Sequence, residues 1–238
     1  MSQPFRQGDL IYRSRLWEGV QFKLLDSSRI ETFSPIRLRT LSNAVHLGGF
    51  AEAHRIVNWK VPIPYDCDDP VGDVDTQFRQ WEYEPARTVG LLTAAKLTHA
   101  SIVEVEGDRF TLLCCTTSGT GNAARAGMPR ETFSAYTAGT INTILLVDGQ
   151  MTDSAMVNAI ITASEAKAAA LQDLKIVDFE NGNIATGTTT DAVVIGVSQN
   201  EQYGALHAYA GTATTIGNAI GQLVYDTVHE ACRTQLES

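Results

Sequence analysis

A nearly continuous apolar segment followed by a long alanine-rich segment constrains this sequence more than any other feature. Residues 140–147 read Thr-Ile-Asn-Thr-Ile-Leu-Leu-Val, which is typical of a fully buried strand. Residues 154–174 repeat apolar side chains at helical spacing. A second buried strand over residues 191–198 and a second helix over residues 215–236 follow. The second half of the chain therefore predicts the order strand, helix, strand, helix.

The first half of the chain is richer in strands than in helices. Short alternating segments within residues 10–25 predict antiparallel strands. Residues 42–50 predict a strand that ends in a glycine pair. Residues 98–106 and 110–117 predict two strands joined by a hairpin turn at Gly107-Asp108.

These segments together predict an α+β fold in a single domain that spans residues 1–238. We expect layered mixed or antiparallel sheets flanked by two long helices, and an αββα sandwich is one arrangement that satisfies this pattern. Apolar residues make up 44% of the chain, which supplies enough material for a packed core. Neither a linker of disordered composition nor an internal repeat divides the sequence.

Composition excludes several functional classes. The formal net charge is -9 and the basic residues are scattered, which disfavours binding to nucleic acid. No apolar run reaches the length of about 18 residues that a membrane span needs. The four cysteines and five histidines show no metal-ligand spacing, so we expect neither a protein metal site nor a cofactor. We also expect a cytoplasmic protein. Apolar faces on both late helices predict a homodimer.

Three loops place glycine and small polar residues beside strand ends, at residues 116–122, 138–142 and 185–191. Glycine lets the backbone approach a ligand, while threonine and asparagine add hydroxyl and amide hydrogen bonds. Such loops suit a ligand rich in carboxamides, or an oxyanion formed from an amide carbonyl. The alternative is a set of tight turns whose threonines satisfy local backbone groups. The candidate substrate-binding residues are Asn43, Gly119, Thr120, Gly121, Gly139, Thr186, Gly187 and Thr188.

Lys167 is also a candidate substrate-binding residue, because it falls on the apolar stripe of the long predicted helix. A lysine that is partly buried needs a partner for its charge. One interpretation is a side chain that extends to solvent past its apolar neighbours. The other is an ion pair with Asp148 or Asp191 at a functional site.

Five segments resemble, in order, the adenosylcobinamide amidohydrolase family: residues 117–127, 139–148, 157–171, 186–193 and 209–212. The resemblance covers a core over residues 42–238, and residues 1–41 correspond to variable N-terminal strands. It implies hydrolysis of adenosylcobinamide to adenosylcobyric acid and aminopropanol, a reaction of corrinoid salvage. The corrinoid is then a small-molecule partner, and its cobalt belongs to the substrate.

The order of the late elements is also similar, more distantly, to the end of the β-aminopeptidase family. Enzymes of that family use an N-terminal nucleophile, which they expose by cleaving their own chain before a Ser or Thr at the start of the corresponding strand. The corresponding residue here is Thr140, which follows Gly139. An uncleaved threonine lacks the free α-amine that acts as base, so it would need a neighbouring base, or water would be activated directly.

Amide hydrolysis then makes Thr140 the candidate nucleophile. The candidate bases are His46, His54 and Asp191. The amides of Asn122 and Asn142, together with backbone N–H groups of the glycine loops, are candidates for stabilising the oxyanion. Two alternatives are a corrinoid-binding protein without catalysis and an autoprocessing peptidase that splits before Thr140.

Overall fold

The computed structural model describes residues 2–63, 65, 67–130 and 139–237. Within them lies a nine-stranded sheet with the order β1-β2-β3-β12-β9-β7-β6, in which β4 also pairs with β3 and β5 pairs with β4. The strands are β1 (Ile11–Arg13), β2 (Gln21–Leu25), β3 (Arg29–Ser42), β4 (Gly49–Lys60), β5 (Thr88–Thr93), β6 (Ser101–Gly107), β7 (Phe110–Gly119), β9 (Thr140–Asp148) and β12 (Ala192–Val197). Two short pairs join β8 (Ala123–Ala124) to β11 (Gly187–Thr188) and β10 (Gln150–Met151) to β13 (Leu206–His207).

The helices are α1 (Pro70–Gln80), α2 (Asp153–Asp173) and α3 (Thr215–Thr234), with short 3-10 turns at Phe5–Gln7, Pro85–Arg87, Leu97–His99 and Glu201–Tyr203. Thr152 and Thr214 cap the first turns of α2 and α3 by accepting backbone N–H groups. None of the helices in the described part of the chain is long and apolar enough to cross a membrane.

The sheet is curled into two layers because β3 is long and irregular. Its first part pairs with β2 and its last part with β12, while β4 follows its other edge. The register between β3 and β4 shifts between Phe33 and Leu38, and such an irregularity bends a strand and increases its twist. One layer therefore contains β2, β4 and β5, and the other contains β6, β7, β9 and β12.

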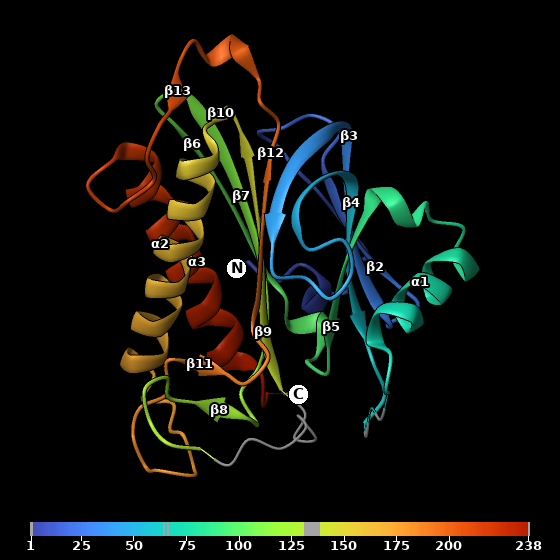
Figure 1. Ribbon diagram of the computed structural model, residues 1–238, viewed down its shortest axis with the longest axis vertical. Helices are drawn as coiled ribbons and strands as arrows, with labels where there is room; N and C mark the ends of the chain where they lie inside the picture. The colour runs from blue at the N-terminus through green and yellow to red at the C-terminus, as the bar shows by residue number, and fades with distance from the viewer. Residues whose placement is uncertain (1, 64, 66, 131–138, 238) are drawn as a thin grey trace.

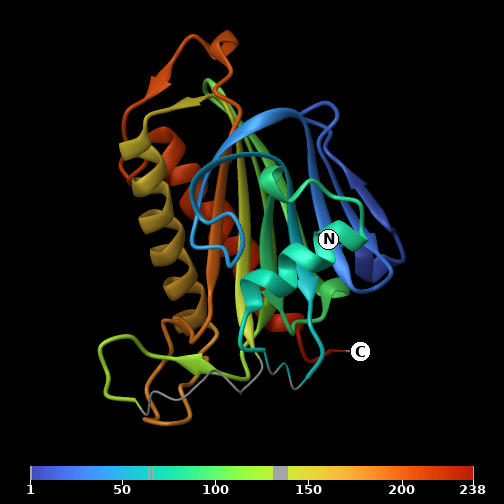
Figure 2. The same cartoon turned by 45° about the vertical axis from the view of Figure 1, so that its right-hand side comes forward.

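Three apolar clusters hold these layers together. Helices α2 and α3 cover the outer face of the second layer, where Leu145 and Ile195 pack against Ile220. The two sheet layers meet through an inner core that includes Ile56 and Ile144. Helix α1 covers β4 and β5 from the other side, so that Figure 1 and Figure 2 show helices on both outsides of a double sheet layer. The predicted α+β fold is confirmed, with the layers in the order αββα.

Strand β9 is buried along its whole length and presents alternate residues to the two cores. Ile141 and Leu145 join the core beneath the helices, whereas Ile144 joins the inner core. Cys114 and Cys115 of the neighbouring β7 divide in the same way. The continuous apolar run in the sequence thus reflects a strand covered on both faces.

Two predicted strands are corrected by the structure. The segment 42–50 is not one strand, because β3 ends at Ser42 and β4 begins at Gly49. Leu47 and Gly49 have φ values of 56° and 76°, so the chain reverses there before it pairs antiparallel with β3. The strand predicted from residue 98 begins at Ser101, because Leu97–His99 form a 3-10 turn.

Candidate functional site

Thr140 is the first residue of β9 and its side chain is buried. The β7–β9 register places it opposite Gly119. Gly139 precedes it in a crowded position: a Cβ there would lie 2.3 Å from Asn122 Oδ1 and 2.7 Å from the Gly119 carbonyl oxygen. Glycine at position 139 therefore lets these backbones approach one another, as the sequence pattern predicts.

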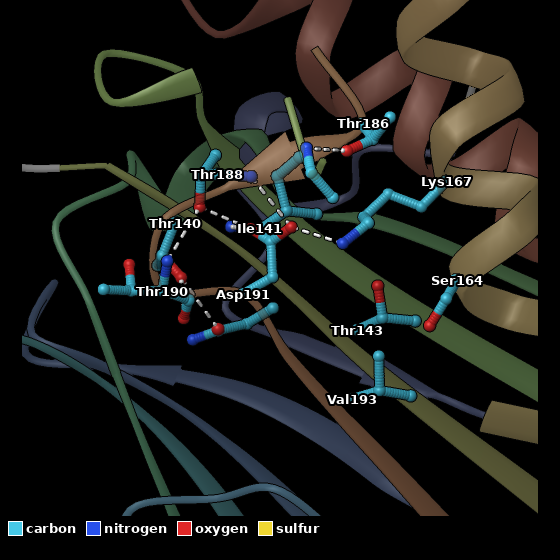
Figure 3. A network of polar contacts seen from close by, with 12 residues as sticks. Thr140, Ile141, Thr143, Ser164, Lys167, Thr186, Thr188, Thr190, Asp191 and Val193 are labelled. Atoms are coloured by element: carbon cyan, nitrogen blue, oxygen red, sulfur yellow. Dashed lines mark hydrogen bonds and ion pairs between the residues drawn. The ribbon is translucent and has the colours of Figure 1, made fainter. Parts of the chain in front are cut away.

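A turn formed by residues 188–191, here called the 188–191 turn, holds residues 139–141 by three hydrogen bonds. Thr190 Oγ1 donates to the Gly139 carbonyl over 2.9 Å, and Thr140 Oγ1 donates to the Thr190 carbonyl over 2.9 Å. The backbone N–H of Ile141 donates to Asp191 Oδ1 over 3.0 Å. The position of the Thr140 hydroxyl is thus set by this turn (Figure 3).

The turn is itself fixed by Asp191, whose two carboxylate oxygens each accept from two groups. Oδ1 accepts from Ile141 N–H and from the Thr188 hydroxyl. Oδ2 accepts from Thr188 N–H and from Lys167 Nζ, which extends from α2 (Figure 3). Of the two partners that the sequence offered for Lys167, the structure pairs it with Asp191. Both oxygens of this carboxylate are therefore engaged, by hydrogen bonds and by the ion pair.

Gly187 makes room for this mostly buried ion pair. A Cβ at position 187 would lie 2.4 Å from Asp191 Oδ2 and 2.8 Å from Lys167 Nζ. Asn43 adds a further tie, because its Nδ2 donates to the Asp191 carbonyl over 2.8 Å and its Oδ1 accepts from Val193 N–H over 2.8 Å. Helix α2, the 188–191 turn and the start of β9 are therefore linked through one carboxylate.

Asn142 lies between the two sheet layers and is fully engaged there. Its Nδ2 donates to Asn58 Oδ1 over 2.8 Å and to the Leu92 carbonyl over 2.9 Å, which uses both amide protons. Its Oδ1 lies 3.3 Å from Thr140 Oγ1. Asn58 donates in turn to Thr117 Oγ1 over 2.8 Å. Asn142 can therefore orient the Thr140 hydroxyl but has no amide proton left for a ligand.

Asn58 is a site residue that sequence reasoning missed. It is buried in β4 between apolar neighbours, and an asparagine in such a run needs a polar partner. A polar residue among apolar neighbours is visible in the sequence, but it does not identify the partner. That partner is Asn142 on β9, which lies 84 positions away.

Asn122 retains hydrogen-bonding capacity that Asn142 lacks. Its Nδ2 donates to Thr189 Oγ1 over 2.6 Å, which accounts for one of its two amide protons. Among the described residues its buried Oδ1 has no hydrogen-bond partner. The side chain also lines the large cavity beside the 188–191 turn, so it is available to a bound molecule.

This cavity has a volume of about 1310 Å³ and lies between α2, residues 121–130 and the 188–191 turn. Five of the predicted substrate-binding residues line it: Gly121, Thr186, Gly187, Thr188 and Lys167. Thr120 faces α3 instead, where it exchanges two hydrogen bonds of 2.8 Å with Gln235. Gly119, Gly139 and Asn43 belong to the surroundings of Thr140 and Asp191 described above.

The two candidate histidines lie away from Thr140 and Asp191. His46 packs edge-on against Phe78 of α1, with its Nδ1 3.1 Å from the Thr88 carbonyl oxygen. His54 lines a shallow hollow with Ser198, beyond the C-terminal end of β12, whereas Asp191 precedes the N-terminal end of that strand. The structure brings Thr140, Asn122, Asn142 and Asp191 together but does not bring either histidine to them.

Asp178 organises the outer wall of the cavity. It is fully buried and accepts from Arg125 N–H over 2.8 Å and from the Arg130 guanidinium over 2.7 Å. The N–H of Glu180 and the side chain of Asn181 donate to it as well. Burial by itself would raise the pKa of this carboxyl, but the four donors outweigh burial and lower the pKa to about 2.

Replacing Asp178 with Asn is expected to destabilise the protein in a pH-dependent way. At neutral pH the loss of charged hydrogen bonds should lower the free energy of unfolding by about 2 kcal/mol. Because the folded-state pKa lies below the value of the unfolded chain, this contribution is present above about pH 4 and disappears as the pH falls toward the folded-state pKa. Urea unfolding of both proteins between about pH 3 and pH 7 measures it. If Asp178→Asn lowered the free energy of unfolding equally at about pH 3 and about pH 7, the stabilising role of the Asp178 charge would be contradicted.

Within the described residues, no three His, Cys, Asp or Glu side chains lie close enough together to hold a metal ion. The polar groups at the site are hydroxyls, amides and one ion pair. Such groups can provide a nucleophile and hydrogen-bond donors for an acyl group.

Comparisons with known proteins agree with this chemistry. Residues 25–238 match the family model described as adenosylcobinamide amidohydrolase. A Methanosarcina mazei protein of the same description is 32% identical over 183 residues, which are 74% of this chain and 82% of the relative. An uncharacterised Methanocaldococcus jannaschii protein is 29% identical over 209 residues, which are 77% of this chain and 78% of the relative.

Two solved structures align with most of this chain, at lower sequence identity. A Burkholderia sp. β-aminopeptidase aligns with 86% of this chain and 77% of its own, with a TM-score of 0.43 and 12% identity. A Pyrococcus horikoshii protein aligns with 87% of this chain and 76% of its own, with a TM-score of 0.42 and 9% identity.

Proposed function

Because this chain belongs to the adenosylcobinamide amidohydrolase family, we propose that it hydrolyses the amide joining aminopropanol to adenosylcobinamide. The products are adenosylcobyric acid and aminopropanol, as in the salvage of incomplete corrinoids. The observation that carries the proposal into the structure is the Thr140 hydroxyl, held by the 188–191 turn and Asn142 at the start of a buried strand. In this proposal the substrate occupies the large cavity on the other side of that turn. All four cysteines lie in the described part of the chain and none is in a disulfide, which supports a reducing compartment such as the cytoplasm.

In this proposal Thr140 Oγ1 attacks the carbonyl carbon of the substrate amide, and the leaving nitrogen of the substrate takes the place of a neighbouring base. The C–N bond breaks, and the hydroxyl proton ends on the departing amine nitrogen, so aminopropanol leaves as a neutral amine. The acyl group is then an ester of Thr140. Water attacks that ester: its oxygen enters the carboxylate, one of its protons restores the Thr140 hydroxyl, and the other is released to solvent. Thr190 and Asn142 orient the hydroxyl, while the Lys167–Asp191 pair keeps the turn in place.

Asn122 is the proposed donor to the oxyanion that forms during attack. Only one of its amide protons is used by Thr189, and the side chain lines the cavity. Replacing Asn122 with Ala is therefore expected to lower kcat on the order of a hundredfold, with a smaller effect on KM. Steady-state kinetics with adenosylcobinamide measures both constants.

Asn218→Ala provides a matched control, because Asn218 is an exposed asparagine on α3 outside the site. It should retain the kinetic constants of the parent protein. A loss in Asn122→Ala that appears only in KM would instead assign Asn122 to ground-state binding.

The proposed activity is tested by incubating the purified protein with adenosylcobinamide and separating the products by liquid chromatography and mass spectrometry. We expect adenosylcobyric acid and aminopropanol in equal amounts, at many turnovers per protein. Corrinoid binding without product would favour a binding protein. Denatured fragments split before Thr140, in place of an intact mass of 25.8 kDa, would favour the autoprocessing alternative.

A further inference from the structure

Three large apolar side chains are exposed on the wall of the same cavity. Phe179 is 84% exposed, Ile161 is 49% exposed and Met128 is 41% exposed, and all three line the cavity. Single exposed apolar residues are ordinary, but several around one cavity mark a surface that binds a ligand. We call these three side chains the apolar lip.

Hydrogen bonds and ion pairs hold the residues on both sides of Phe179. Its neighbour Asp178 is fully buried and accepts four hydrogen bonds, one of them from the N–H of Glu180 on the other side of Phe179. Arg130 bridges both carboxylates, at 2.7 Å to Asp178 and 3.0 Å to Glu180. An aromatic ring exposed on a segment that is fixed on both sides loses little conformational freedom when a ligand covers it.

The remaining walls of the cavity are mixed, with small apolar residues such as Ala123 and Ala168 beside hydrogen-bonding side chains. Ser164 and Lys167 of α2 line it, and so do Thr186 and Thr188 beside the 188–191 turn. The ligand that matches these walls has an apolar face and a periphery of hydrogen-bonding groups. A volume of about 1310 Å³ also exceeds the roughly 300–1,000 Å³ usual for sites of small drug-like ligands.

We propose that the apolar lip binds one face of the corrin macrocycle, while the scissile amide extends past Thr189 and Asn122 to Thr140. This inference rests on the proposed function for the identity of the ligand. A flat macrocycle rimmed with carboxamides presents the required apolar face and polar edge. Thr189 and Asn122 line the cavity and are hydrogen-bonded to each other, and the Asn122 side chain lies against Gly139, the residue before Thr140.

The test separates binding from chemistry. The dissociation constant of adenosylcobyric acid, a corrinoid without the scissile amide, is measured by equilibrium dialysis for the parent protein, Phe179→Ala and Phe179→Tyr. Phe179→Ala is expected to weaken binding roughly tenfold or more, because it removes an aromatic contact area. Phe179→Tyr, which keeps the ring, should bind within about twofold of the parent protein. Phe179→Ala should likewise raise KM for adenosylcobinamide and leave kcat unaltered, whereas Phe179→Tyr should keep both constants close to those of the parent protein.

Leu206→Ala serves as the control, because Leu206 is another exposed apolar side chain (60%) and lies on β13, outside the cavity. It should leave the dissociation constant unchanged. An unchanged dissociation constant in Phe179→Ala overturns the assignment of the apolar lip, even if the parent protein hydrolyses adenosylcobinamide. If the parent protein binds the corrinoid through Phe179 but releases no aminopropanol, the proposed function fails and the binding surface stands.

Discussion

Replacing Thr140 with Ala is expected to lower kcat for adenosylcobinamide by about a thousandfold or more, as loss of a covalent nucleophile does. The substitution removes the hydroxyl that forms the acyl ester in the proposed mechanism. It also removes a hydrogen bond to the Thr190 carbonyl, which should cost about 1 kcal/mol of stability and leave the protein folded. Thr140→Ser keeps the hydroxyl and should retain most of the activity. Kinetics and thermal unfolding of the three proteins measure these effects.

Thr143→Ala is the matched control for this experiment. Thr143 is another buried threonine of β9, and its hydroxyl lies 3.4 Å from that of Thr116 instead of at the site. Thr143→Ala should alter the stability of the protein and leave kcat close to that of the parent protein. Parent-like turnover in Thr140→Ala would remove the nucleophile assignment and favour attack by water activated directly.

Replacing Lys167 with Met should have the second largest effect. It leaves the mostly buried Asp191 carboxylate without its cation, and breaking a buried ion pair from one side costs about 3–5 kcal/mol. Since Asp191 fixes the 188–191 turn, and the turn fixes the Thr140 hydroxyl, kcat should fall together with stability. Urea unfolding and steady-state kinetics at a temperature where the variant is folded measure both.

A double-mutant cycle separates the ion pair from simple packing. Lys167→Met combined with Asp191→Asn should be less destabilised than the sum of the single variants, because neither buried charge is then left alone. Gly187→Ala tests the same geometry independently, since its Cβ would crowd both partners. Strict additivity in the cycle would contradict the coupling of Lys167 to the turn.

Much of the fold follows from patterns that are local in the sequence. The apolar run of β9 and the helical periodicity of α2 and α3 depend on neighbouring residues only. The curl of the sheet does not, because it depends on the register shift between Phe33 and Leu38 and on β3 pairing with β12 from far along the chain. The sequence therefore predicted the α+β layers but placed one strand across the β3–β4 reversal.

The candidate site also combines residues that local sequence patterns indicate with residues that only distant contacts bring together. Thr140 is a candidate nucleophile because the resemblance to the β-aminopeptidase family points to the start of this strand, and Lys167 is a candidate because a charge on an apolar stripe requires a partner. The histidines were named by residue type alone, and the fold carries His46 to α1 and His54 to the opposite end of β12. Asn58 and the fully engaged amide of Asn142 depend on contacts between layers, which no local pattern reveals.

Hydrolysis in water enriched in oxygen-18 tests the central claim, that this chain cleaves the amide of adenosylcobinamide, most directly. We predict that mass spectrometry will find one heavy oxygen in the new carboxylate of adenosylcobyric acid and none in aminopropanol. Adenosylcobinamide recovered intact and unlabelled, after incubation with an equal amount of folded protein, would contradict the claim.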